Sequence, residues 1–397
     1  MAQICFTWEL GQGYGHLVRY RMLIARLLER GHQVAFIAKD PARARKVFDG
    51  MAVSVVPIEP GSTPPSERLV RLNSYPEIMH DFGFSQPGYL RRQLARWLRI
   101  LHTLRPDVLI VDHSPTALVA ARIEGVRVVS SGSGFTVPPR VAPMPALRYW
   151  SGREREQLVR HEQLVLDTCN TVLRAHGAAP LAAVAELFTT AAEWILSFPE
   201  LDHYGAREGA DYLGSFSAAG FGVPPRWQTI DGPKLFAYLS VARLSAELLA
   251  ALRSGNGNLC IHAPALPPEE FARLSPERTV VASRPVDLAL VAGTADVVIT
   301  NGSLNSVSGF LAAAVPQLAL PNNLERHLVG RRLELTGGGL MARWHQPARL
   351  TDKLRTLISD RAFRRGAEQF AIRYRSASAL QQCARMLADL ERVLERR

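Results

Sequence analysis

The chain has 397 residues, of which 47% are hydrophobic and 21% are charged, a composition typical of a globular protein of two domains. No window reaches about 18 consecutive apolar residues, which excludes a typical transmembrane helix, and the four cysteines form no CxxC pair, which argues against a disulfide framework or a zinc site. The net charge of +11 favours anionic ligands such as nucleotides, but the basic residues lie scattered over helical stretches without interleaved aromatics, so we expect no nucleic-acid partner.

The N-terminal residues predict a strand, a glycine-rich loop, a helix and a second strand. The apolar run 4–8 precedes Gly11–His16, apolar residues then recur at helical spacing over 17–28, and 33–38 is a further apolar run. Such a βαβ unit is expected in a parallel sheet. Because the N-terminus lacks a basic region and a small-residue cleavage site, we expect no signal peptide. The widely spaced cysteines fit a reducing compartment, so we expect a cytoplasmic location.

Strands and helices continue to alternate along the rest of the chain. In the first half we expect strands at 53–58, 108–111, 126–130 and 194–197, and helices at 88–104, from 117 and at 154–175. In the second half we expect strands at 235–239, 258–262, 279–282, 297–300 and 317–320, helices at 245–254, 268–274, 286–292, 304–313 and 325–334, and a charged helical segment at 351–397.

Two such blocks predict an α/β protein with two doubly wound Rossmann-like domains. We place the first domain at 1–217 and the second at 232–375, with a linker at 218–231 that contains two glycines and two prolines. Residues 376–397 are expected to form a C-terminal helix that packs back on the first domain.

Two loops carry residues suited to chemistry. In the first, Gly11–His16, glycines allow backbone N–H groups to approach a ligand at a helix N-terminus, and His16 follows the first strand, where ligands of such sheets bind. Position alone leaves two interpretations of His16 open: a general base, or a histidine that packs locally. The second loop, Thr300–Ser306, follows an apolar strand and offers hydroxyls, amides and a glycine to phosphate oxygens.

Three blocks of the chain together resemble the GT-B glycosyltransferases of the natural-product, flavonoid and macrolide type, a UDP-glycosyltransferase-like family with bacterial members. The first block runs from the loop Gly11–His16 to Arg30-Gly31-His32-Gln33-Val34, and the second is Arg105–Asp112. The third block runs from Ala295–Gly302, through Pro316, to Glu325-Arg326. The resemblance implies two Rossmann-like domains that face a central cleft, with the donor mainly on the second domain and the acceptor on the first.

The resemblance also implies roles for single residues. His16 is placed as the catalytic base, and Asp112 is the nearest candidate for its supporting acid, since Leu118, Val119 and Ala120 fill the stretch just beyond the strand. The implied acceptor-binding residues are Tyr14, Phe82 and Phe135, beneath loops at 73–87 and 135–145. The implied donor-binding residues are Gly13, Gly15, Arg284, Val286, Asn301, Gly302, Ser303, Asn305, Ser306, Glu325 and Arg326.

The chain departs from the family pattern at three donor positions. Asn301 stands where the family has a phosphate-contacting histidine, Arg326 replaces a glutamine, and the ribose-binding acid expected near Gly309 is absent. A neutral Asn301 supplies no charged donor to the leaving diphosphate; Arg326 either restores that charge or signals a different donor.

The resulting prediction is an inverting, metal-independent hexosyltransferase that moves a sugar from a UDP- or dTDP-sugar to a small-molecule acceptor, with no further cofactor. Three alternatives stay open: a GT-B protein that has lost catalysis and assists a partner enzyme, a nucleotide-sugar 2-epimerase, and an NAD-dependent dehydrogenase, whose GxGxxG loop is missing here. The sequence predicts neither the oligomeric state nor the acceptor.

Overall fold

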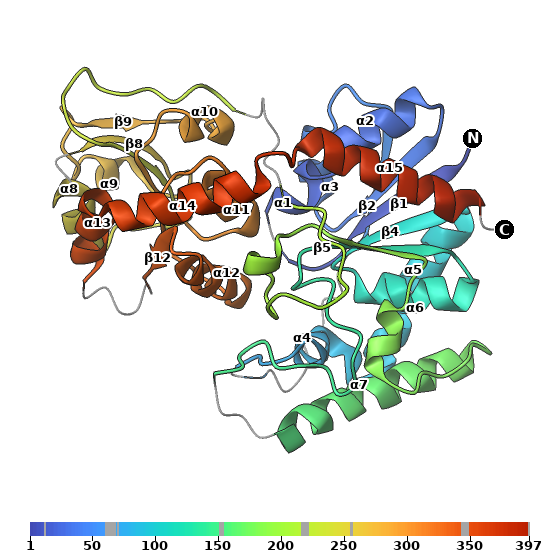
Figure 1. Cartoon of the computed structure of the whole chain (residues 1–397). Helices are drawn as coiled ribbons and strands as arrows, with labels where there is room; N and C mark the ends of the chain where they lie inside the picture. Colours follow the sequence, from blue (N-terminus) through green and yellow to red (C-terminus); the bar gives the residue numbers. More distant parts are fainter. Residues whose placement is uncertain are drawn as a thin grey trace. The chain divides into compact units, whose positions relative to one another are not determined.

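The computed structural model describes residues 1–11, 13–59, 69, 71–150, 155–215, 222–254, 257–342 and 349–395. The chain divides into two compact units (Figure 1). Unit 1 comprises Met1–Leu196, Arg207–Leu213 and Leu380–Arg397, and unit 2 comprises Ser197–Ala206 and Gly214–Ala379. Each unit contains one six-stranded sheet whose neighbouring strands run parallel.

The sheet of unit 1 has the order β3-β2-β1-β4-β5-β6. This order reverses between β1 and β4, and a doubly wound sheet opens a crevice at the carboxyl ends of the strands at such a point. The strands are short apolar runs, as parallel sheets covered on both faces require. They span β1 Gln3–Trp8, β2 Gln33–Ala38, β3 Val53–Pro57, β4 Val108–Asp112, β5 Val128–Gly132 and β6 Ala192–Ile195.

The helices of unit 1 differ from the sequence prediction in three places. The helix expected at 17–28 is two helices, α1 (Gly15–Val18) and α2 (Arg21–Glu29). The loop expected at 73–87 contains α4 (Tyr75–Met79) and a π-helical turn at His80–Phe84. Helix α3 was not predicted, although Asp40 caps it by accepting from the Arg43 N–H. Helix α3 spans Pro41–Val47. The longer helices of this part of unit 1 are α5 Pro87–Leu104, α6 Pro115–Glu124 and α7 Arg155–Ala175.

Unit 2 repeats the same winding, with strand order β12-β11-β10-β7-β8-β9 and the reversal between β7 and β10. Its strands are β7 Lys234–Tyr238, β8 Asn258–His262, β9 Thr279–Val281, β10 Val297–Thr300, β11 Gln317–Ala319 and β12 Gly339–Met341. Its helices are α8 Ala246–Ser254, α9 Pro268–Phe271, α10 Leu288–Ala292, α11 Leu304–Ala312, α12 Leu324–Leu335, α13 Leu350–Ser359 and α14 Arg361–Tyr374. Strand β12 was missed because its glycines resemble only a helix C-terminus.

The C-terminal helix α15 (Ala379–Glu395) contributes its buried side chains to the core of unit 1. Met386, Leu390 and Val393 belong to the same buried cluster as Trp194 of β6. Polar contacts accompany this packing, because the Trp194 indole N–H donates to Asp389 Oδ2 at 3.1 Å and Arg127 Nη1 donates to the Val393 carbonyl at 2.9 Å. In the part of the chain that the structure describes, no helix has the length and apolar character that a membrane span requires.

The packing of α15 predicts that replacing one of its leucines with alanine strongly lowers the stability of unit 1 and that replacing another hardly changes it. Leu390 is 1% exposed and Leu380, on the same helix, is 63% exposed. We expect Leu390→Ala to lower the free energy of unfolding of unit 1 by about 2–5 kcal/mol, because it removes buried contacts and leaves a cavity. Leu380→Ala is expected to stay within about 0.5 kcal/mol of wild type. Urea unfolding followed by tryptophan fluorescence measures both, and equal effects would contradict this packing.

Candidate active site

The two residues predicted to be catalytic meet where the sheet of unit 1 reverses. His16 lies in α1, directly after the loop that follows β1, and Asp112 is the last residue of β4. Because β1 and β4 are neighbours, with Trp8 opposite Asp112 in the register, the two side chains approach one another. His16 Nδ1 is 3.1 Å from Asp112 Oδ1, and the side chains are 6% and 0% exposed.

Asp112 is surrounded by groups that favour its charged form. The Tyr20 hydroxyl donates to Asp112 Oδ2 at 3.2 Å and is 2.8 Å from Ser131 Oγ, and Arg19 Nη1 is 3.7 Å from the same carboxylate oxygen. Burial by itself raises the pKa of Asp112, but the charges of His16 and Arg19 outweigh burial and hold that pKa below its usual value. Asp112 therefore stays a carboxylate at neutral pH.

Asp112, and not a residue further along the chain, lies against His16. The stretch Leu118–Ala120 belongs to α6 and is buried and apolar. A buried carboxylate needs a hydrogen-bonding or charged partner, and His16, Arg19 and Tyr20 supply partners from one side. The structure thus brings the predicted pair His16 and Asp112 together.

A second histidine, which the sequence analysis did not single out, lies beside this pair. His113 follows Asp112 at the end of β4, and its ring centroid is 6.2 Å from that of His16. Its backbone has φ +48, and its carbonyl accepts from the Leu10 N–H at 2.9 Å. Burial lowers the pKa of His113 to about 3, so the ring is neutral at physiological pH. Its place directly after a strand was the signal available in the sequence.

Aromatic rings border the two histidines. The indole of Trp8 stacks on His16 with centroids 5.5 Å apart, and the rings of Tyr75 and Phe135 lie 6.1 Å and 5.8 Å from that of His113. The structure therefore brings Phe135, a predicted acceptor residue, to this cluster. Of the other two, Phe82 is 38% exposed in the turn after α4, and Tyr14 caps α1 with its ring 5.0 Å from the Arg43 guanidinium.

Where the strand order of unit 2 reverses, an uncharged amide side chain joins two loops. Asn301 follows β10, and its Oδ1 accepts from the Ser240 N–H at 3.0 Å. Its Nδ2 donates to Ser240 Oγ at 3.1 Å and to the Tyr238 carbonyl at 3.3 Å. The Asn301 amide therefore ties the loop after β10 to the loop after β7.

The predicted phosphate turn lies at the N-terminus of α11. Gly302 has φ +74, a conformation that favours glycine, and Ser303 is the N-cap residue. Ser303 Oγ donates to Ser306 Oγ at 2.9 Å, and Asn305 Oδ1 accepts from the Ser215 hydroxyl at 2.8 Å. The first turn of a nine-residue helix presents N–H groups without intrahelical partners, which suits an anion.

The remaining predicted donor residues are spread over both units. Glu325 is in the first turn of α12, and Arg326 Nη1 donates to Asn322 Oδ1 at 2.8 Å. Arg284 is exposed, whereas the Val286 side chain is 6% exposed in a buried cluster. The predicted glycines of unit 1, Gly13 with φ +99 and Gly15 at the start of α1, belong instead to the loop beside His16.

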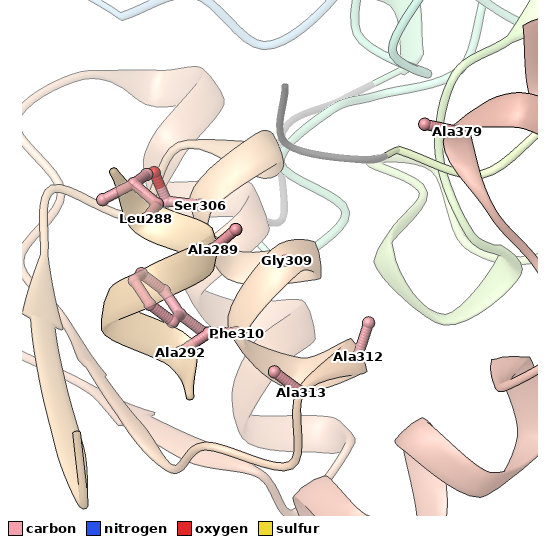
Figure 2. Close-up of a pocket in the computed structure, with 9 residues that line it drawn as sticks. All are labelled: Leu288, Ala289, Ala292, Ser306, Gly309, Phe310, Ala312, Ala313 and Ala379. Atoms are coloured by element: carbon pink, nitrogen blue, oxygen red, sulfur yellow. The ribbon is translucent and has the colours of Figure 1, made fainter. Parts of the chain in front are cut away.

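A pocket of about 310 Å³ lies along α10 and α11 (Figure 2). It shares Ser306 with the phosphate turn and includes Gly309, the position where the family resemblance leads us to expect an acid. Apart from the Ser306 hydroxyl, its named side chains are apolar. They are Leu288, Ala289, Ala292, Phe310, Ala312, Ala313 and Ala379. Among the described residues, no group of three or more histidine, cysteine, aspartate or glutamate side chains is arranged to hold a metal ion.

A buried acid behind the site was also missed by the sequence analysis. Glu9 follows β1, is 5% exposed, and accepts from the Thr116 N–H at 3.1 Å and from the Trp97 indole N–H at 3.2 Å. Burial raises the pKa of Glu9 to about 7, despite these hydrogen bonds. Glu9 thus joins the end of β1 to the start of α6, which follows Asp112 in the chain.

The chain is similar to proteins that are named as glycosyltransferases. No family model matches the chain. The chain is 25% identical over 370 residues to a zeaxanthin glucosyltransferase of Pseudescherichia vulneris, covering 87% of this chain and 88% of the relative. It is 26% identical over 375 residues to a PGL/p-HBAD biosynthesis glycosyltransferase of Mycobacterium tuberculosis, covering 90% and 85%. The crystal structure of the glycosyltransferase VinC in complex with dTDP matches over 100% of both chains, with a TM-score of 0.69 and 19% identity.

The raised pKa of Glu9 predicts a specific pH dependence of stability. Since the folded protein binds this proton more tightly than the unfolded chain does, stability falls as the pH rises from about 4.5 to about 7. We expect this carboxyl to contribute on the order of 3 kcal/mol to that fall. Thermal unfolding of wild type and Glu9→Gln across this range measures it as the difference between the two curves. Parallel curves would contradict the assignment.

Proposed function

We propose that this GT-B glycosyltransferase transfers a sugar, with inversion, from a nucleoside-diphosphate sugar to a hydroxyl group of a small natural product, and that His16 is the base. The observation that carries the proposal is the 3.1 Å contact between His16 Nδ1 and Asp112 Oδ1 at the point of reversal of the unit 1 sheet. This buried pair favours a working enzyme over a protein that has lost catalysis.

The role of each partner follows from imidazole chemistry. A carboxylate beside Nδ1 favours the tautomer with the proton on Nδ1, so that Nε2 carries the lone pair. His16 Nε2 then removes the proton of the acceptor hydroxyl while the acceptor oxygen attacks the anomeric carbon. Asp112 stabilises the imidazolium that forms, and Arg19 and Tyr20 hold the carboxylate in place.

The donor is assigned to unit 2. The N–H groups at the start of α11, from Ser303 to Ser306, suit the diphosphate, and Arg326 supplies the positive charge that Asn301 lacks. Because helix N–H groups and an arginine stabilise the leaving diphosphate in this proposal, no metal ion is required. The VinC complex with dTDP supports dTDP as one candidate nucleotide beside UDP.

The acceptor is assigned to the aromatic surroundings of the two histidines in unit 1. The rings of Tyr75 and Phe135 give His113 apolar surroundings, which suit an apolar or planar acceptor. The relatives named for zeaxanthin and for PGL/p-HBAD biosynthesis support a small natural product as the acceptor class.

Loss of the base is expected to remove most of the turnover. We expect His16→Ala to lower kcat by about 10²–10⁴-fold, because general base catalysis contributes roughly that factor. The measurement is release of nucleoside diphosphate from UDP-glucose and dTDP-glucose in the presence of phenolic and polyene alcohol acceptors. His102→Ala is the matched control, since His102 is 66% exposed on α5, and it should keep wild-type turnover. Wild-type turnover in His16→Ala would refute the role of the base.

Loss of the arginine charge is expected to weaken donor binding. We expect Arg326→Ala to raise the Kd for dTDP or UDP by about tenfold or more, because one charge-assisted hydrogen bond contributes about 1.5–3 kcal/mol. Calorimetric titration measures the Kd, and Arg355→Ala, on the exposed face of α13, is the control. No binding of any nucleoside diphosphate by wild type would reject the donor site itself.

A further inference from the structure

The pocket along α10 and α11 has no part in the function proposed so far. Its volume of about 310 Å³ is large enough for a small-molecule site. It begins at Ser306, which also belongs to the phosphate turn, and reaches Ala312 and Ala313 at the other end of α11 (Figure 2). A ligand whose phosphate groups bind at the start of α11 therefore has this pocket directly beside it.

The chemistry of a nucleotide fixes which part of it lies next to the phosphate turn. The sugar of a nucleoside diphosphate is joined directly to the first phosphate, and the base follows the sugar. Gly309 lies three residues after Ser306, which is about 4.5 Å along the helix axis, and both residues line the pocket. When the diphosphate binds at Ser303–Ser306, the sugar of the nucleoside therefore reaches the helical turn that contains Gly309.

Gly309 has no backbone reason to be glycine. It lies inside α11 and is not among the glycines with positive φ. A glycine at an ordinary helical position weakens the helix relative to alanine. The gain at this position is space, because a larger residue at position 309 would narrow the pocket that it lines.

The pocket offers almost no partner to a sugar hydroxyl. Ser306 carries the single polar side chain among the nine residues that line it. Ser306 Oγ already accepts from Ser303 Oγ at 2.9 Å, and it lies at the phosphate end of the pocket, one turn before Gly309. The other side chains are those of alanine, leucine and phenylalanine. A hydroxyl group placed among them loses water without gaining a hydrogen bond, which lowers affinity.

We propose that the nucleoside of the donor binds in this pocket, and that Gly309 makes the enzyme select a 2′-deoxyribose over a ribose. The inference rests on the proposed function, which leaves the donor open between UDP- and dTDP-sugars. It names the chemical class of the donor as a sugar ester of a 2′-deoxyribonucleoside diphosphate, and it names residue 309 as the position that determines this preference.

The selection works through a penalty on the ribose. The two kinds of nucleoside carry the same diphosphate and the same 3′-hydroxyl, and they differ only at C2′. A ribose presents a hydroxyl there, which has to leave water, whereas a deoxyribose presents a CH₂ group that apolar walls accommodate. A hydrogen-bonding side chain at position 309 would remove this difference, because it would give the 2′-hydroxyl a partner.

The first test compares nucleotides that differ in the 2′-hydroxyl alone. One pair is UDP and 2′-deoxy-UDP, and the second pair is 5-methyl-UDP and dTDP, so that the methyl group of the base is matched within each pair. Calorimetric titration of the full chain measures each Kd. We expect the deoxy member of both pairs to bind about five- to a hundredfold more tightly.

The second test changes residue 309. Gly309→Gln adds an amide at the turn beside the sugar, and we expect it to reduce the ratio of the two Kd values in each pair to about twofold or less. Gly309→Ala is the matched control, because it adds a side chain without a hydrogen-bonding group and should keep the wild-type ratio. Leu290→Gln, on α10 and 47% exposed, adds the same amide away from the pocket and should also keep it.

Each outcome decides the inference. Equal Kd values within the pairs, or tighter binding of the ribose members, overturn it, as does a wild-type ratio in Gly309→Gln. Loss of the ratio in Gly309→Ala also overturns it, because crowding rather than hydrogen bonding would then set the preference. Thermal unfolding shows whether the glutamine variant is folded, and Gly309→Ser takes its place if it is not. Failure of wild type to bind any nucleoside diphosphate would instead reject the donor site of the proposed function.

Discussion

The buried carboxylate of Asp112 is the constraint on which the unit 1 site depends. A charge with no exposed surface is costly unless partners surround it, and here the partners come from one short stretch of chain. Arg19 and Tyr20 form the turn between α1 and α2 and follow His16 by three and four residues, which brings all three side chains to the same carboxylate. The loop before His16 and the end of β4 therefore have to meet, and the neighbouring positions of β1 and β4 bring them together.

The two units share the same strand order but gather different chemical groups where that order reverses. At the reversal of unit 1, charged and titratable groups gather, with Asp112 as a carboxylate and His113 kept neutral by burial. At the reversal of unit 2, a neutral amide joins two loops, because Asn301 is bonded to Ser240 and Tyr238. This division suits proton removal in unit 1 and anion binding at the start of α11, where the helix supplies N–H groups rather than a charged side chain.

Prediction from sequence succeeded where a pattern was local and long. Apolar runs of four to six residues predicted most strands of both sheets, and the loops Gly11–His16 and Thr300–Ser306 marked the two points of reversal. It failed for α3 and α4, whose five to seven residues are too few to show a helical period, and for β12, which has three residues. Glu9 and His113 carried no recognisable motif, because a single charged or ring side chain after a strand is common and most have no role.

The amino-acid sequence by itself determined which segments form strands, which loops hold glycine, and which residues are chemically able to take up a proton or bind a phosphate. Those properties depend on near neighbours in the chain. Only the tertiary structure decided that residue 112, and not residues 118–120, meets His16, and that Glu9 is closed in by Trp97 and Thr116. The physical reason is that strand order in the sheet sets long-range contacts, and burial by those contacts sets the pKa values of the site.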